Sequence, residues 1–288
     1  MGKNLGLITY FMMYVVTAST NFFFVKFALK YLAPLPLMSI RYAIAGVTLA
    51  LISLAVQGNF KLIINNKDML LLALFSSLSS TLWAYGLVYV DPASSALFSY
   101  TMPFFALILS PLLTNERPRL MNIVGVTIGF SGVVLYAESY IARGFSLIGA
   151  LFTIANAVFW ALYSTYFKRL GEFDGFSVVV SMFFLGSLMM ALPSLILYGP
   201  GFLVNTDWGN ADFLFYLLGT SVIGGALLFL TWYLIVNVAG ITNAVSYIFA
   251  VPALTLLLEY IVLGIKPTPL ELVGSGVMFL GIYLSSLR

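Results

Sequence analysis

Long apolar segments alternate with short polar or charged connections along the whole chain. Ten such segments, each of about 18–25 residues, are bounded by charged residues or by glycine and proline. They cover Leu5–Phe27, Pro34–Val56, Met69–Val90, Ser94–Leu113, Leu120–Ala137, Phe145–Phe167, Phe176–Leu197, Phe213–Val236, Thr242–Leu263 and Leu270–Leu287. Inside a bilayer only helices and closed barrels satisfy their own backbone polar groups, and the period-two alternation of barrel strands is absent. The pattern predicts an all-α integral membrane protein with ten transmembrane helices.

Two parts of the chain match each other without a gap. Residues 83–135 and 232–284 align at an offset of 149, with 10 of 53 positions identical. The informative matches are Trp83/Trp232, Pro103/Pro252, Pro118/Pro267, Gly125/Gly274 and Gly132/Gly281, because tryptophan, proline and glycine fix packing or backbone features. We expect two five-helix repeats, residues 1–140 and 141–288. Since five is odd, the second repeat crosses the membrane in the opposite sense, a plan common in secondary transporters, whose site lies where the halves meet.

Composition supports a bilayer location and narrows the chemistry. Hydrophobic residues make up 61% of the chain and charged residues only 8%, against about 25% charged in soluble domains. Histidine and cysteine are absent, which excludes disulfides, the usual zinc and haem sites and a Ser-His-Asp triad. We expect no catalytic residues, no metal and no cofactor. The net charge of +3 is spread over the loops, so nucleic acid is not an expected partner.

The cations also predict an orientation. With the N-terminus inside, eight cations are cytoplasmic and four are external, which favours cytoplasmic termini. The cytoplasmic set is Lys3, Lys61, Lys67, Arg117, Arg119, Lys168, Arg169 and Arg288, and the external set is Lys26, Lys30, Arg143 and Lys266. We expect a multi-pass protein of a prokaryotic cell membrane whose first helix is retained, present as a monomer or homodimer.

Polar and aromatic residues predict where a solute binds. Tyr14, Ala18 and Asn21 lie on one helix face, and Asn156, Trp160 and Tyr163 repeat that spacing 142 residues later. With Trp83, Tyr100, Trp232, Asn243 and Tyr247 these residues could form an aromatic pocket with amide hydrogen-bonding groups, suited to amino acids or similar amphipathic molecules. For each aromatic residue, packing or lipid contact is the alternative.

Arg41 is a cation deep in the second apolar segment, where it costs about 2.5–3.5 kcal/mol on insertion scales unless it is paired or hydrated. Glu259 lies in the outer part of the ninth apolar segment and is the only acid well inside an apolar run there. We hypothesise that Arg41 and Glu259 pair or jointly line a charged outer vestibule; a fixed ion pair that locks two helices is the alternative. Lys26 is either a further solute ligand or an interfacial anchor.

Proline and glycine predict the mobile and the tightly packed helices. Pro103 and Pro252 lie inside apolar segments, where each would remove a backbone hydrogen bond and bend its helix, either as a hinge or as a static kink. Gly125 and Gly129 predict close helix packing. We expect the last helix of each repeat to be a rim or dimer element, away from the solute.

These features together resemble the EamA-type branch of the drug/metabolite transporter superfamily, which includes bacterial amino-acid and metabolite exporters. The resemblance covers the whole chain: in each repeat a proline-containing fourth helix precedes a short turn and a glycine-spaced fifth helix. The turns are Asn115-Glu116-Arg117-Pro118 and Gly264-Ile265-Lys266-Pro267, and Arg41-Tyr42 is similar to the family's arginine–aromatic pair. Ile265 stands where the family usually has an acid. The resemblance implies transport of small polar or amphipathic metabolites.

The sequence therefore favours a secondary transporter that exports a small, amino-acid-like molecule by alternating access. A nucleotide-binding GxxxxGK[ST] loop is absent, which excludes ATP hydrolysis by this chain. Proton coupling, exchange and facilitated diffusion stay open. A channel or a non-transporting scaffold is the alternative; an intramembrane lipid-modifying enzyme would need a cluster of catalytic groups that the sequence does not supply.

Overall fold

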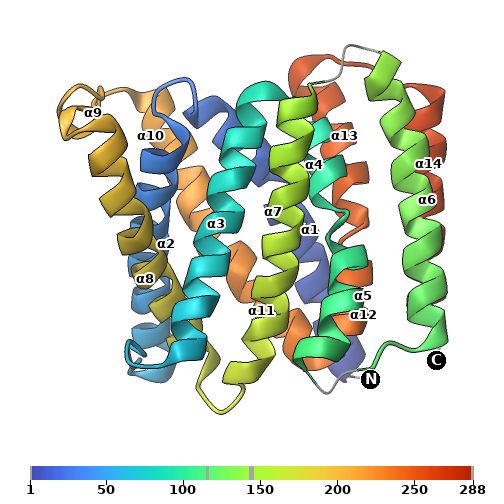
Figure 1. The fold of residues 1–288 in the computed structure, drawn as a ribbon, viewed down its shortest axis with the longest axis horizontal. Coiled ribbons are helices and arrows are strands. Elements are labelled where there is room, and N and C mark those ends of the chain that lie inside the picture. The colour runs from blue at the N-terminus through green and yellow to red at the C-terminus, as the bar shows by residue number, and fades with distance from the viewer. Residues whose placement is uncertain (1, 115–116, 143–145, 287–288) are drawn as a thin grey trace.

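The computed structural model describes residues 2–114, 117–142 and 146–286, and every secondary-structure element in these ranges is helical (Figure 1). Nine helices in the described ranges are long and apolar enough to cross a membrane, and the tenth predicted segment is the shorter apolar helix Pro269–Ser285. The prediction of ten apolar helices is confirmed. Some residues used in the predictions lie outside the described ranges. They are Asn115 and Glu116 of the predicted turn, the cations Arg143 and Arg288, and the predicted helix ends Phe145 and Leu287.

Six of the spans are single α-helices. They are α1 (Gly2–Ala28), α2 (Pro34–Gln57), α3 (Lys67–Tyr89), α6 (Leu120–Ala142), α7 (Leu147–Phe167) and α8 (Gly175–Tyr198). The last helix is α14 (Pro269–Ser286), and the connections include η1 (Lys168–Leu170) and α9 (Gly201–Val204). Several helices begin at a side chain that accepts a backbone N–H, as Asn66 does from Met69 and Asp174 from Ser177.

The three remaining spans are interrupted. The fourth consists of α4 (Pro92–Ser99) and α5 (Met102–Leu113), and the ninth of α12 (Ile241–Tyr247) and α13 (Ala250–Leu263). The eighth consists of α10 (Ala211–Leu218), the π-helix η2 (Gly219–Leu227) and α11 (Leu228–Ala239).

The prolines expected to bend continuous helices lie directly after two of these interruptions. Pro103 is in the first turn of α5 and Pro252 in the first turn of α13, where a missing N–H costs little because it would have no helical partner. The expected mid-helix kink is therefore wrong: each helix stops and restarts at the same place in both repeats. Whether the two breaks act as hinges stays a prediction.

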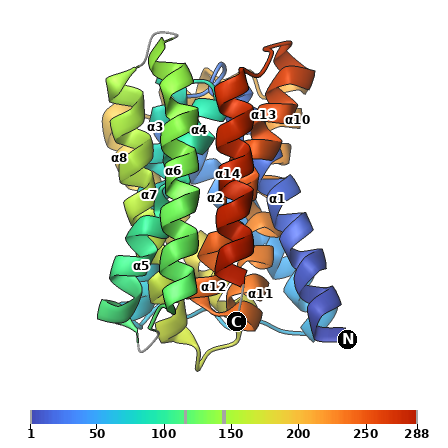
Figure 2. The same cartoon turned by 90° about the vertical axis from the view of Figure 1, so that its right-hand side faces the viewer.

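The last helices of the two repeats form a tightly packed antiparallel pair, seen side by side in Figure 2. A Cβ atom added to Gly125 would lie 2.6 Å from the Gly281 carbonyl oxygen, and one added to Gly132 would lie 2.6 Å from that of Gly274. One added to Gly281 would also lie 2.7 Å from the backbone nitrogen of Gly129. The predicted close packing is confirmed, and only glycine permits it.

These glycine contacts also fix the relative direction of the repeats. The earlier glycine of α6 meets the later glycine of α14 and the reverse, which requires antiparallel helices. In Figure 1 the chain leaves α3 at the top, where α4 begins, whereas it descends from α10 through η2 to α11. The helices that carry Trp83 and Trp232 thus run in opposite directions, and the fold is an inverted repeat.

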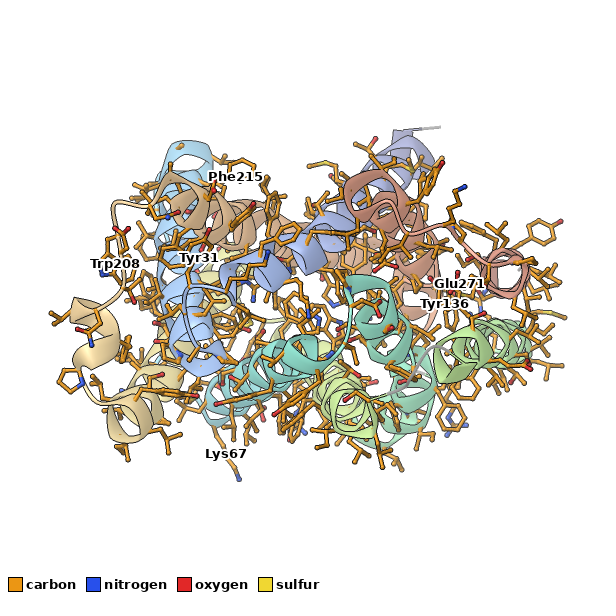
Figure 3. All side chains as sticks on the ribbon, turned by 90° about the horizontal axis from the view of Figure 1, so that it is seen from above. Tyr31, Lys67, Tyr136, Trp208, Phe215 and Glu271 are labelled. Carbon is orange, nitrogen blue, oxygen red and sulfur yellow. The ribbon has the colours of Figure 1, made fainter. Side chains whose placement is uncertain are left out.

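The first helix of each repeat packs against helices of the other repeat. The first helix of the N-terminal repeat, α1, packs on α11 and α13, and its counterpart α7 packs on α3 and α5. Viewed from above, Tyr136 and Glu271 mark the end of the molecule formed by α6 and α14, and Trp208 lies at the opposite end (Figure 3). The centre of the bundle is therefore the seam between the repeats.

Candidate functional site

A cavity of about 50 Å³ lies at this seam. Its walls come from both repeats: α1, α2, α3 and the α4–α5 break on one side, α7, α11 and the α12–α13 break on the other. The lining residues are Tyr14, Ala18, Asn21, Phe22, Arg41, Ser80, Trp83, Ser99, Tyr100, Met102, Asn156, Trp160, Leu228, Phe229 and Ile248. All of them except Trp160 are buried. No lining residue belongs to the described parts of α6 or α14, which agrees with their expected place at the rim.

The structure brings seven of the predicted site residues together around this cavity: Tyr14, Asn21, Arg41, Trp83, Tyr100, Asn156 and Trp160. Sequence reasoning missed Phe22, Ser80, Ser99, Met102, Leu228, Phe229 and Ile248. The last three are apolar residues in an apolar chain, and nothing in their spacing distinguishes them from core residues.

Arg41 is held in the cavity wall by main-chain carbonyl groups. Its Nε donates to the Thr220 carbonyl oxygen at 3.0 Å and its Nη2 to the Gly224 carbonyl oxygen at 2.7 Å. Both acceptors belong to η2, where the wider π-helical turn changes the normal helical hydrogen-bond pattern. The side chain is 1% exposed. A cation at this depth is thus stabilised by backbone dipoles.

The hypothesised pair of Arg41 and Glu259 is wrong for this conformation. Glu259 is buried, but its Oε1 accepts from the Ala93 backbone N–H at 3.4 Å, in the first turn of α4, and it lies beside Asp91. Helix N-termini stabilise negative charge, which explains its position there. Glu259 does not line the cavity.

Two asparagine side chains tie the walls together. Asn21 Oδ1 accepts from the Thr220 hydroxyl at 2.8 Å, which connects α1 to the π-helix that holds Arg41. Asn156 Oδ1 accepts from the Ser79 hydroxyl at 2.6 Å, and its Nδ2 donates to Ser99 Oγ at 2.9 Å. The predicted polar positions therefore face the bundle interior.

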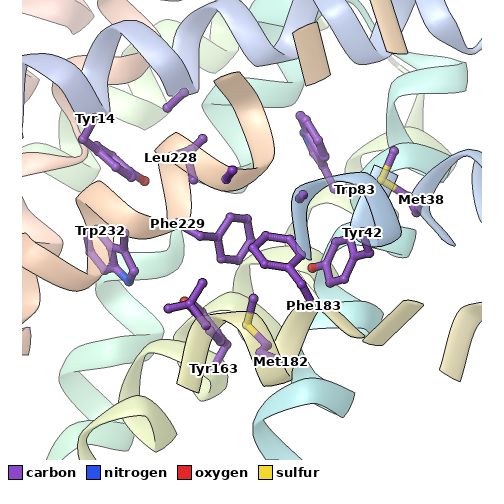
Figure 4. Close-up of a cluster of buried hydrophobic side chains, with 14 of the residues drawn as sticks. Tyr14, Met38, Tyr42, Trp83, Tyr163, Met182, Phe183, Leu228, Phe229 and Trp232 are labelled. Atoms are coloured by element: carbon purple, nitrogen blue, oxygen red, sulfur yellow. The ribbon is translucent and has the colours of Figure 1, made fainter. Parts of the chain in front are cut away.

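Aromatic side chains form most of the remaining wall. Phe22 packs edge-on against Trp83, with ring centroids 5.1 Å apart, and Trp160 packs on Phe229 at 5.2 Å. Two predicted residues, Tyr163 and Trp232, do not line the cavity and belong to the buried cluster that surrounds Phe229 (Figure 4). Trp232 packs on Tyr14 at 5.2 Å and donates from Nε1 to Ser164 Oγ at 3.1 Å, and Tyr163 packs on Phe229 at 5.5 Å.

The other three predicted residues lie away from the cavity and join helices to one another. Lys26 Nζ donates to the carbonyl oxygens of Leu87 at 2.6 Å and Val90 at 2.9 Å, at the C-terminal end of α3. Asn243 Oδ1 accepts from Asn122 Nδ2 at 3.0 Å, which ties α12 to α6. Tyr247 packs on Phe11, with ring centroids 5.7 Å apart.

Replacement of Lys26 by methionine is expected to destabilise the protein by about 1.5–3 kcal/mol, because two charge-assisted hydrogen bonds to otherwise free helix-end carbonyls are lost. Lys30→Met, in the turn directly after α1, is the control, since the Lys30 side chain is exposed and lies over the Phe27 ring at 5.1 Å; its effect should stay within about 0.5 kcal/mol. Thermal unfolding of the two purified variants in one detergent checks the difference, and equal stability would contradict the anchoring role.

The fold defines a multi-pass integral membrane protein built as an inverted repeat around a central cavity. The sequence profile of the EamA-like transporter family matches the chain twice, over residues 5–137 and 147–287. The chain therefore belongs to the EamA-like transporter family.

Known proteins similar to this chain agree with that assignment. An uncharacterized transporter from Acidianus ambivalens is 37% identical over 87% of this chain and 93% of its own length. A protein from Streptantibioticus cattleyicolor named "probable terminal-alkyne amino-acid exporter" is 26% identical over 71% of this chain and 67% of its own length. A crystal structure with a TM-score of 0.75 covers 99% of this chain and 97% of its own chain at 19% identity, which supports the fold.

Proposed function

We propose that this transporter works by alternating access and exports a small amphipathic, amino-acid-like metabolite. The observation that carries the proposal is the cavity at the seam, which is lined almost entirely by buried residues of both inverted repeats. A buried site at the meeting point of inverted repeats can be opened to either side by rocking one repeat against the other.

The cavity wall favours a solute with both apolar and polar parts. The aromatic rings of Phe22, Trp83 and Trp160 offer apolar surface, whereas Asn21 and Arg41 offer hydrogen-bonding groups. The exporter named above is a distant relative and gives limited support for an amino-acid-like solute and for the outward direction.

The cellular setting belongs to the proposal as well. We infer a prokaryotic cell membrane with both termini cytoplasmic, supported by the excess of cations in the loops assigned to that side. One of these cations, Arg169, pairs with Asp68 at 3.4 Å. A monomer or homodimer in the lipid bilayer, without a nucleic-acid or enzymatic role, completes the proposal.

Flux measurements in proteoliposomes test the carrier mechanism. We expect uptake of labelled amino acids from a mixed panel to saturate with concentration and to accelerate when the vesicles are preloaded with the same unlabelled solute. Flux that neither saturates nor shows counterflow would indicate a channel. Absence of flux for the whole panel, with ligand-free thermal unfolding still cooperative, would favour a scaffold.

A further inference from the structure

We propose that the cavity recognises a solute through one anionic group of the carboxylate type, held by Arg41 and the indole N–H of Trp83. This inference rests on the proposed transport function and specifies the chemistry of its solute. It follows from the positive charge of Arg41, which favours an anion, and from the buried indole N–H of Trp83 beside it, which requires an acceptor.

Arg41 brings a positive charge that has no acidic partner among the residues lining the cavity. The lining residues include neither aspartate nor glutamate. The guanidinium group has five N–H donors. Its hydrogen bonds to the carbonyl oxygens of Thr220 and Gly224 and to Met38 Sδ at 3.7 Å use three of them. The other donors remain for a ligand.

Trp83 adds a second donor of the same kind. Its Nε1 is buried and has no hydrogen-bond partner among the described residues, although the side chain is only 7% exposed. Trp232, at the equivalent position of the other repeat, donates to Ser164 Oγ. The Arg41 guanidinium carbon lies 5.8 Å from the centre of the Trp83 ring. The two donor groups are therefore neighbours in one wall.

Nearby charged groups outside the cavity already have partners. Lys26 donates to two carbonyl oxygens of α3, and Asp91 accepts from the backbone and hydroxyl of Ser94. Glu259 accepts from the Ala93 N–H. Arg41 carries the only charge among the lining residues, so one negative charge, as in a carboxylate, balances the cavity better than a doubly charged phosphate would. The aromatic wall would contact the remainder of the solute.

The natural absence of cysteine allows a direct measurement of the potential in the cavity. Ala18→Cys places a single thiol among the lining residues. The purified variant in detergent is treated with an anionic reagent, 2-sulfonatoethyl methanethiosulfonate, and with a cationic one, 2-(trimethylammonio)ethyl methanethiosulfonate. Each rate is divided by the rate of the same reagent with 2-mercaptoethanol. A cation that favours the thiolate accelerates both reagents, so this effect cancels in their ratio.

We expect the normalised anion-to-cation rate ratio at the introduced thiol to exceed about ten, because clefts of one sign concentrate counter-ions to this extent. Adding Arg41→Gln should bring the ratio close to one, whereas Arg41→Lys should keep it well above one. If Arg41→Gln does not fold, the ratio of the Ala18→Cys protein and its response to Arg41→Lys decide the question.

The outcomes separate this inference from the function on which it rests. A ratio near one in the Ala18→Cys protein, or a ratio that Arg41→Gln leaves unchanged, would overturn anion recognition while the cavity remains a solute site. If neither reagent reacts, solutes do not reach the cavity, which contradicts the proposed transport function and the inference together.

Discussion

Replacing Gly274 by valine is expected to destabilise the protein by about 1–3 kcal/mol, the usual cost of overfilling a packed interface. A Cβ atom at this position would lie 2.7 Å from the Gly132 carbonyl oxygen and 3.0 Å from the Tyr136 backbone nitrogen. Backbone atoms cannot rotate away as a side chain can, so α6 and α14 would have to separate. Thermal unfolding of the purified protein in detergent measures the loss.

Gly276 provides a matched control on the same helix. A Cβ atom there meets nothing within 4 Å, and the position is exposed. Gly276→Val therefore carries the same change in helix propensity without the contact, and should leave stability within about 0.5 kcal/mol. Equal destabilisation by the two substitutions would show that helix propensity, and not the approach of the two backbones, determines the effect.

Replacing Gly224 by alanine is expected to lower transport activity at least about tenfold, because small displacements of positioning groups have large kinetic effects. The added Cβ would come within 2.1 Å of both Asn21 Oδ1 and Cγ. Asn21 Oδ1 accepts a hydrogen bond from the Thr220 hydroxyl, and the Gly224 carbonyl oxygen accepts one from Arg41 Nη2. Either the asparagine or the π-helix must move, and both belong to the cavity wall.

A double substitution separates this steric effect from general damage. Asn21→Ala removes the two atoms that lie closest to the new methyl group, leaving its own Cβ at 2.7 Å. Gly224→Ala combined with Asn21→Ala should therefore be more stable than the sum of the two single effects, since residues in contact are not additive. Additive losses in unfolding temperature would contradict the contact as the cause. The predicted loss of transport in Gly224→Ala is measured separately, as the initial rate of solute uptake per amount of reconstituted protein.

The helices could be predicted from the sequence because their length and apolar character follow from the bilayer itself. The inverted arrangement could also be predicted. Trp83/Trp232 and the paired glycines fix the alignment of the two repeats, and the odd number of helices per repeat means that the second repeat crosses the membrane in the opposite direction. The interruptions of the fourth and ninth spans were missed in part. Proline marked their position, but a proline inside a continuous helix and one at a helix start have the same local sequence.

The cavity was predicted only where polarity revealed it. Asn21, Asn156 and Arg41 stand out in an apolar chain, and each lines the cavity. Lys26 and Glu259 stand out equally, yet their partners are backbone groups at the ends of α3 and α4. Helix ends provide such partners for any charged side chain that reaches them, and reach depends on helix rotation, which a single sequence does not specify.

The crossed glycine contacts between α6 and α14 have the form of an interface between two identical subunits, in which position i of one meets position j of the other and j meets i. In a dimer of identical subunits both sides of the interface have the same sequence, so a substitution at one position alters two contacts at once. After the two copies share a single chain, each contact can change alone. This explains how Ser110 and Glu259, which are equivalent under the 149-residue offset, come to differ in charge while the glycines between the rim helices stay the same.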